Sequence, residues 1–187
     1  MAKFSIAILG GSSIGQIFEY QSASIDLAAA LSSLDCEIIC CGGKTGLIGT
    51  FIENYADPEN IQAVILKQEL ESIDERIVNI TISANTANRK ETILAKSDLI
   101  LALPGGIGTI DEILSYISAQ KIGEHNKPIV LVDISDFYKP LLSLFENLVS
   151  SGFLKTQFLD TIISVASIKQ VHDLTLRLKD EQSFSRL

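Results

Sequence analysis

The sequence of 187 residues contains few of the residues that build disulfide scaffolds or metal centres. Its three cysteines, Cys36, Cys40 and Cys41, lie in one short segment, which argues against a disulfide framework and indicates a reducing compartment. Because Cys40 and Cys41 close an apolar run, we interpret them as buried small hydrophobic residues rather than reactive thiols. The two histidines, His125 and His172, are far apart in the sequence, so we expect neither a metal site nor a cofactor.

Long apolar runs and clusters of positive charge are also missing. No stretch reaches the roughly 18 to 20 apolar residues that a membrane span needs, and the apolar run after Lys3 ends in glycines and serines instead of a cleavage site. The formal net charge is -8 and the basic residues are scattered, which disfavours binding to nucleic acid. We therefore predict a soluble, cytoplasmic protein with neither a membrane nor a nucleic acid as partner.

Apolar runs of strand length alternate with helix-length segments along the whole chain. Strands are expected at residues 4–9, 37–41, 61–66, 77–82, 98–103, 128–132 and 161–165, and helices at residues 17–33, 47–56, 85–96, 109–122, 138–150 and 168–179. The runs at 99–103 and 129–132 are apolar on both faces, which is typical of parallel strands covered by helices on both sides. The pattern predicts an α/β doubly wound parallel sheet in a single domain, residues 1–180, followed by a frayed tail at 181–187.

Glycine-rich turns follow three of the predicted strands, at residues 10–13, 42–46 and 104–109. Open α/β sheets bind ligands at the carboxyl ends of their strands, and glycine lets the backbone approach an anion closely. None of the turns is a standard fingerprint, because Lys44 follows Gly43 directly instead of closing a P-loop. Three such turns at one edge of the sheet nevertheless favour a phosphorylated ligand over simple strand–helix connections.

Charged side chains accompany the third turn. Asp111 and Glu112 lie at the start of the following helix, where either carboxylate could cap the helix or point over the phosphate cradle. Arg89 and Lys90 belong to the preceding helix, where they could form a solvated face, bind phosphate or polarise a leaving base. A carboxylate that points over the phosphate cradle could stabilise positive charge on a sugar ring or orient water.

These residues resemble a known family. The stretch from Leu103 to Glu112 matches the Pro-Gly-Gly-x-Gly-Thr-x-x-Glu signature of the Lonely Guy family of cytokinin riboside 5'-monophosphate phosphoribohydrolases. Residues 10–13, 42–49 and 89–90 are similar to other family motifs, as are the downstream stretches 123–128, 137–142 and 152–153. The family is often labelled as lysine decarboxylases. A pyridoxal-dependent decarboxylase is a poor interpretation, because the chain is short and no lysine has a recognisable cofactor context.

The resemblance implies a Rossmann-like, three-layer homodimer that cleaves the N-glycosidic bond of AMP or N6-substituted AMP to a free base and ribose 5-phosphate. It implies that Arg89 and Glu112 are the catalytic pair. The residues expected to hold the nucleotide and its phosphate are Gly10, Gly11, Ser12, Ser13, Gly42, Gly43, Lys90, Pro104, Gly105, Gly106, Gly108 and Thr109. A non-catalytic carrier of a nucleotide or of molybdenum cofactor is the alternative for the same fold.

The chain departs from the family pattern at three places. Thr86-Ala87-Asn88 replaces Met-His-Glu before Arg89, Ile107 replaces a common tyrosine, and Lys44 replaces a common glycine. These changes concern the walls around the base more than the phosphate site, and they leave the identity of the base open. We interpret His125, which also matches a family position, as a structural loop residue.

Overall fold

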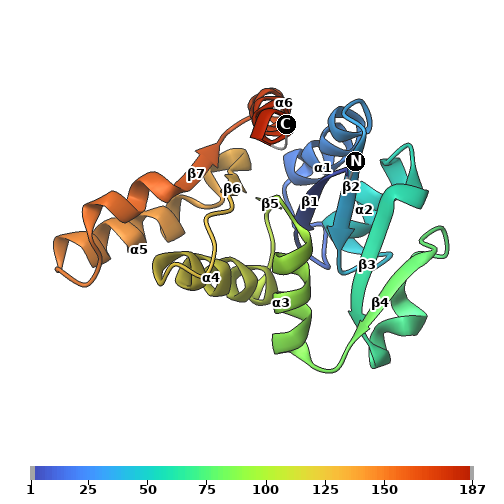
Figure 1. The fold of residues 1–187 in the computed structure, drawn as a ribbon. Helices are drawn as coiled ribbons and strands as arrows, with labels where there is room; N and C mark the ends of the chain where they lie inside the picture. Colours follow the sequence, from blue (N-terminus) through green and yellow to red (C-terminus); the bar gives the residue numbers. More distant parts are fainter. Residues whose placement is uncertain (1–2, 186–187) are drawn as a thin grey trace.

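A computed structural model describes residues 3–185, and one seven-stranded sheet runs through this part of the chain (Figure 1). The strand order is β4-β3-β2-β1-β5-β6-β7, and all neighbouring strands are parallel. The strands are β1 Phe4–Leu9, β2 Cys36–Cys40, β3 Ile61–Leu66, β4 Asn79–Ser83, β5 Leu99–Ala102, β6 Ile129–Val132 and β7 Ile162–Val165. The predicted parallel sheet is therefore confirmed.

Helices cover both faces of this sheet and make it the middle of three layers (Figure 1). They are α1 Phe18–Ser32, α2 Gly46–Asn54, α3 Thr86–Lys96, α4 Ile107–Lys121, α5 Lys139–Ser150 and α6 Ile168–Ser185. One core cluster joins one face of the sheet to α1, α2 and α6, and the other joins the opposite face to α3, α4 and α5. The expected Rossmann-like α/β/α architecture is confirmed.

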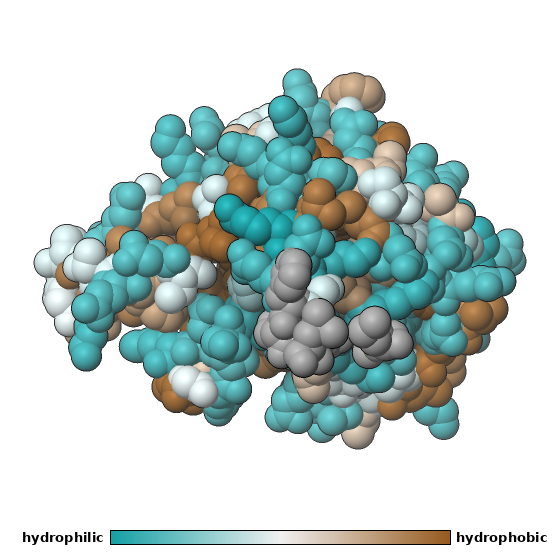
Figure 2. Space-filling model, turned by 45° about the horizontal axis from the view of Figure 1, so that its top comes forward, coloured by the Kyte–Doolittle hydropathy of each residue, from teal (hydrophilic) through white to brown (hydrophobic). Residues whose placement is uncertain are grey.

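The two clusters explain why the central strands are apolar at every position. In β5, Leu99 and Leu101 belong to the cluster under α1, whereas Ile100 and Ala102 belong to the cluster under α3 and α4. Successive side chains of a strand point to opposite faces, so both sets are buried. On the surface, hydrophilic side chains cover most of the face seen in Figure 2, and apolar ones form smaller groups between them.

The last helix is longer than the sequence predicted. Residues 181–185 were expected to form a frayed tail, but α6 continues to Ser185, while residues 186–187 lie outside the described part of the chain. Gln182 Nε2 donates a hydrogen bond of 2.6 Å to Asp98 Oδ1 at the start of β5, which anchors this end of the helix. Among residues 3–185, no helix has both the length and the apolar character that a membrane span requires.

Candidate active site

The candidate site lies where the order of the strands reverses. β1 pairs with β2 on one side and with β5 on the other, so the turns that follow these three strands meet at one edge of the sheet. The Gly11 amide donates to the Pro104 carbonyl (3.0 Å), and the Leu47 amide donates to the Gly11 carbonyl (2.9 Å). Such a topological switch point is the usual ligand site of an open α/β sheet.

Two glycines make this close packing of turns possible. Gly46 has φ 69°, and a Cβ atom there would lie 2.2 Å from the carbonyl carbon of Ser12. A Cβ atom on Gly105 would lie 2.2 Å from Thr109 Oγ1 and 2.8 Å from the Gly11 nitrogen. Any side chain at these two positions would push the turns apart, so the glycines serve close approach of the backbone.

A cleft of about 670 Å³ opens at this edge. Eight of the predicted site residues line it: Gly10, Ser12, Gly43, Arg89, Gly106, Gly108, Thr109 and Glu112. Gly11, Ser13, Pro104 and Gly105 line a neighbouring pocket instead, and Gly42, the first residue of the second turn, is buried. The structure therefore brings the second and third turns together with the two predicted catalytic side chains.

Backbone amides at the start of α4 line one part of the cleft. Helix α4 begins at Ile107, two residues earlier than predicted, with Gly106 as its N-cap residue. The first amides of a helix have no partners within the helix, and the helix dipole adds partial positive charge at that end. Gly106, Ile107, Gly108 and the buried Thr109 all line the cleft at this point, which makes the N-terminus of α4 a suitable site for an anion.

Of the two adjacent carboxylates at the start of α4, Glu112 lines the cleft. Burial raises its pKa to about 7, because the nearby positive charges of Arg89 and Lys90 only partly offset the loss of water. Asp111 points elsewhere: its Oδ2 accepts a hydrogen bond of 3.0 Å from Lys90 Nζ, and it does not line the cleft. Glu112 can therefore change its protonation state near neutral pH, as a general acid or base must.

Arg89, on α3, lines the same cleft as Glu112. Its Nη1 donates to both carboxylate oxygens of Glu69, at 2.9 and 3.1 Å. Its Nε is buried and has no hydrogen-bond partner among the described residues. Burial lowers the pKa of Arg89, but the charges of Glu69 and Glu112 outweigh that effect and raise it above its ordinary value. Arg89 is thus a permanently charged hydrogen-bond donor.

The predicted ligand Lys90 lies next to Arg89 in sequence but outside the cleft. Its Nζ donates to Asp111 Oδ2 (3.0 Å) and Ser115 Oγ (2.9 Å) on α4. Neighbouring helix positions differ by about 100°, so only one of the two basic residues faces the turns. Lys90 ties α3 to α4, and its contact with phosphate stays a prediction.

The residues that replace the family's Met-His-Glu form a helix cap. Asn85 Oδ1 accepts from the Asn88 amide (2.9 Å), and Asn88 Oδ1 accepts from the Ala84 amide (3.3 Å). The first bond satisfies a free amide in the first turn of α3, and the second ties that turn to the residue before the N-cap. Of the three replacement residues, Asn88 takes part in this cap, at the start of the helix from which Arg89 reaches the cleft.

Sequence reasoning missed several residues of the cleft: Cys41, Lys44, Thr45, Glu69 and Ser72. Glu69 belongs to a 3₁₀ segment, η2 (Lys67–Ser72), which lies between the strands predicted at residues 61–66 and 77–82. Cys41 is half-buried, and burial together with Glu112 raises the pKa of its thiol, which keeps the thiol neutral. The position of Glu69 just after a strand, at the same edge as the turns, is the signal that could have identified it.

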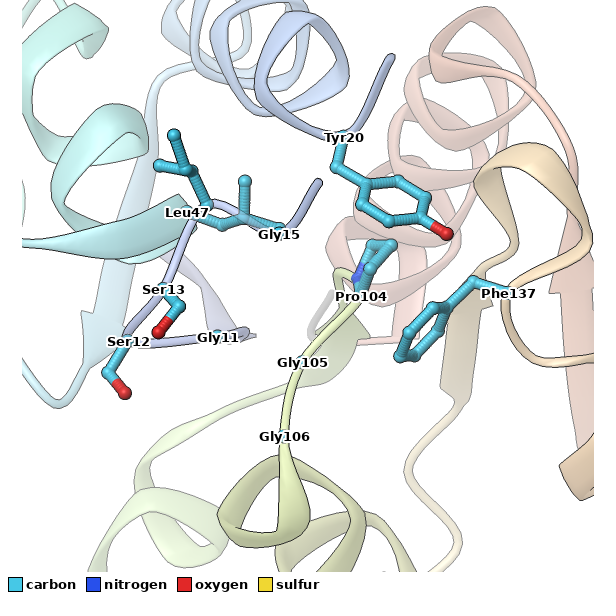
Figure 3. Close-up of a pocket in the computed structure, with 11 residues that line it drawn as sticks. Gly11, Ser12, Ser13, Gly15, Tyr20, Leu47, Pro104, Gly105, Gly106 and Phe137 are labelled. Atoms are coloured by element: carbon cyan, nitrogen blue, oxygen red, sulfur yellow. The ribbon is translucent and has the colours of Figure 1, made fainter. Parts of the chain in front are cut away.

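A second, smaller pocket lies beside the cleft (Figure 3). Its volume is about 220 Å³, and it shares only Ser12 and Gly106 with the cleft. The Tyr20 and Phe137 rings meet edge to face, with centroids 5.6 Å apart, near Pro104. This pocket has an apolar, aromatic wall and no charged lining residue among those of the described chain.

His125 has a structural environment, as predicted. One ring nitrogen lies 2.9 Å from the Tyr116 carbonyl oxygen, and the other accepts from the Lys127 amide at 3.1 Å. Both ring nitrogens are thus engaged by backbone groups, one in α4 and one in the loop after it. No group of three or more His, Cys, Asp or Glu residues in the described part of the chain is arranged to hold a metal ion.

Solved structures share this fold. The molybdenum cofactor carrier protein of Chlamydomonas reinhardtii superposes with a TM-score of 0.72 at 14% identity, over 96% of this chain and 99% of that one. The molybdenum cofactor binding protein of Rippkaea orientalis gives a TM-score of 0.70 at 15% identity, over 93% and 96% of the two chains. At such low identity the likeness shows the fold alone.

Sequence relatives are closer. Residues 37–175 match the family model described as "Possible lysine decarboxylase". A cytokinin riboside 5'-monophosphate phosphoribohydrolase of Arabidopsis thaliana is 32% identical over 174 residues, covering 91% of this chain and 81% of the relative. An Oryza sativa subsp. japonica protein of the same name is 30% identical over 178 residues, covering 94% and 72%. With the Pro-Gly-Gly-x-Gly-Thr-x-x-Glu signature at the start of α4, these matches show that the chain belongs to the Lonely Guy family.

Proposed function

We propose that the protein hydrolyses the N-glycosidic bond of AMP or of an N6-substituted AMP and releases the free base and ribose 5-phosphate. The observation that carries this proposal is the placement of Glu112 and Arg89 in one cleft with the N-terminus of α4. An anion site, a titratable carboxyl group and a fixed positive charge are what cleavage beside a phosphate requires. The relatives named as phosphoribohydrolases of cytokinin riboside 5'-monophosphate support the same reaction class.

The phosphate would bind at the start of α4. The free amides of Gly108 and Thr109 and the hydroxyl of Ser12 can donate hydrogen bonds to its oxygens. Lys44, which lines the same cleft, adds a positive charge. Because these groups sit at one end of the cleft, phosphate binding would place the sugar beside Glu112.

Glu112 would act in its ionised form. Cleavage breaks the bond between the sugar C1' and the base nitrogen, and positive charge develops on the sugar ring. The carboxylate can stabilise that charge and accept a proton from the water whose oxygen bonds to C1'. The bonding electrons leave with the base, which takes a proton from solvent water, and Glu112 then returns to solvent the proton that it accepted, so that the net reaction adds OH to C1' and H to the base. Arg89 can donate hydrogen bonds to the base or the sugar phosphate but cannot supply the proton that the base takes, because its pKa is raised.

The unpartnered Nε of Arg89 supports its role in binding. A buried donor without a partner costs about 1 to 3 kcal/mol. Because Nε has almost no accessible surface, an oxygen of the substrate would satisfy this donor, and recover part of the cost, once the Arg89 side chain shifts on binding. The two predicted roles of Arg89, anchoring the substrate and assisting departure of the base, both use the same donors.

The direct test is a base-release assay. The protein is incubated with AMP and with N6-isopentenyl-AMP, and free base and ribose 5-phosphate are measured by chromatography. We expect equal amounts of the two products from at least one substrate. If no purine or pyrimidine 5'-monophosphate releases base, the proposed reaction is wrong.

The alternative function is that of a carrier without catalysis. The likeness to molybdenum cofactor carriers favours it only at the level of fold, at 14% identity. A carrier needs no titratable carboxyl group beside an arginine, whereas Glu112 and Arg89 lie together here. Binding of a ligand without release of base would favour the carrier.

We also propose that the protein is a homodimer, as the family resemblance implies. Light scattering coupled to gel filtration measures the molar mass directly. We expect about twice the mass of the 20.3 kDa chain at micromolar concentration, and a monomeric mass there would contradict the proposal.

A further inference from the structure

We propose that Glu69 is a positioning residue of the active site, which holds the Arg89 guanidinium in the cleft and divides its charge between Glu69 and Glu112. This inference rests on the proposed function. It concerns a residue outside the family signature, on a segment that joins β3 to β4. The chain thereby contains a carboxylate–guanidinium–carboxylate array of Glu69, Arg89 and Glu112.

A backbone hydrogen bond within its own segment holds the Glu69 carboxylate in place, in addition to its contact with Arg89. Its Oε2 accepts a hydrogen bond of 2.8 Å from the amide of Leu66, the last residue of β3. The carboxylate is thus tied to the carboxyl end of β3. A side chain that is held by the backbone loses less conformational freedom when it binds an arginine.

The contact with Arg89 is close and uses a single nitrogen. Nη1 donates to Oε1 at 2.9 Å and to Oε2 at 3.1 Å. The Arg89 side chain is 17% exposed and that of Glu69 is 37% exposed, so the pair lies at the wall of the cleft and is partly shielded from water. Both bonds to Glu69 use Nη1, and the buried Nε has no partner in the described chain.

The charge of Glu69 should affect the pKa of Glu112, which can be measured. Burial has the largest effect on the Glu112 pKa and raises it; Arg89 and Lys90 lower it, and Asp111 and Glu69 raise it. Cys41 and Tyr116 also interact electrostatically with Arg89 and Glu112, and burial raises the pKa of both groups, so both are neutral. Lys44 lines the cleft with its Nζ 3.4 Å from the Glu71 carbonyl oxygen. When Glu69 loses its charge, Arg89 and Lys90 are opposed by Asp111 alone, so the pKa of Glu112 should fall.

The test compares Glu69→Gln with Glu71→Gln. Glutamine at position 69 keeps an acceptor for the Leu66 amide and removes only the charge, so η2 should keep its structure. Glu71 lies in the same segment, is exposed and offers only its backbone carbonyl to Lys44. The second variant therefore makes the same change in net charge without touching Arg89. Thermal unfolding of both variants reports whether the fold is kept.

We expect Glu69→Gln to lower kcat/KM by roughly 10- to 100-fold, because a misplaced arginine costs about that much. The pH at which kcat/KM is half-maximal should move to lower pH, since Glu112 would ionise more easily. Titration of the substrate phosphate contributes equally to every variant and does not affect the comparison. Glu71→Gln should match the wild type in both rate and midpoint. Glu69→Asp keeps the charge and should leave the midpoint closer to the wild-type value than Glu69→Gln does.

A purely structural role for Glu69 would lower stability and leave the midpoint where it is. An unchanged midpoint in Glu69→Gln, or the same shift in Glu71→Gln, overturns the inference. A titration of the Glu112 carboxyl carbon by NMR, in the wild type and in Glu69→Gln, measures the shift in pKa directly and without catalysis. If the wild type releases no base, the proposed function fails, whereas the NMR titration still decides whether Glu69 controls Glu112.

Discussion

The cleft and the smaller aromatic pocket are two hollows at the switch point. They are lined by the same turns of the backbone but differ in chemistry. Both are bounded by the turns after β1 and β5, and both include Ser12 and Gly106. The cleft receives charged side chains from η2, α3 and α4, whereas the pocket receives Tyr20 from α1 and Phe137 from the segment after β6. The fold thus provides a place for a phosphate, and the elements that flank it decide which side can perform chemistry.

The largest expected effect is on the cleft. Glu112→Gln removes the charge that stabilises the sugar cation, so kcat should fall by roughly 100-fold or more. Asp111→Asn is the matched control, because the neighbouring carboxylate binds Lys90 outside the cleft. Steady-state assays with the substrate that releases base measure both variants. If the two losses were equal, the distinction between the carboxylates would be wrong.

The shared backbone can be tested at Gly105. Gly105→Ala should destabilise the protein by about 1 to 3 kcal/mol and impair catalysis, because the new Cβ would collide with Thr109 Oγ1 and the Gly11 nitrogen. Gly106→Ala controls for stability, since nothing lies within 4 Å of a Cβ at that position. Denaturant unfolding measures both variants. Equal stabilities would show that the turns can separate without cost.

The sequence predicted this shared backbone well. Apolar runs such as residues 129–132 require burial on both faces, so they specify a covered parallel sheet with little ambiguity. Glycine turns after parallel strands must meet at one edge. The signature placed Glu112 at the start of α4, and the structure brings it together with Arg89 in the cleft.

The neighbours of the charged groups could not be predicted in the same way. Glu69 meets Arg89 across 20 residues of sequence, and that contact depends on how η2 and α3 pack at the end of β3. Lys90 and Arg89 are equivalent in sequence until the face of α3 that packs on α4 is known. The anchoring of α6 by Gln182 to Asp98 likewise joins residues 84 positions apart. Such contacts follow from tertiary packing: the position of Glu69 just after β3 indicates the edge at which it lies, but not the partner that it binds.

The burial of Glu112 should also be visible as a stability cost. Its folded pKa of about 7 lies above the ordinary value of 4.5, so the folded state retains a proton that the unfolded state releases between these pH values. Stability is therefore lost as pH rises through this window, at up to about 1.4 kcal/mol per pKa unit. Glu112→Gln should be more stable than the wild type by about 1 to 3 kcal/mol at pH 8, with the advantage shrinking toward pH 4.5. Chemical denaturation across this range measures the difference, and a constant difference would contradict the raised pKa.

The smallest expected effects are in the aromatic pocket. Tyr20→Phe removes a hydroxyl that makes no hydrogen bond within residues 3–185, and Phe137→Leu keeps an apolar side chain of similar size at the pocket wall. Neither residue lies in the cleft, so kcat/KM for AMP should stay within about threefold of the wild type. Ser12→Ala, at the junction of the two hollows, should raise KM more than either change, because its hydroxyl would contact the phosphate. A loss of roughly tenfold or more in Phe137→Leu would instead place part of the nucleotide in the pocket and join the two hollows into one site.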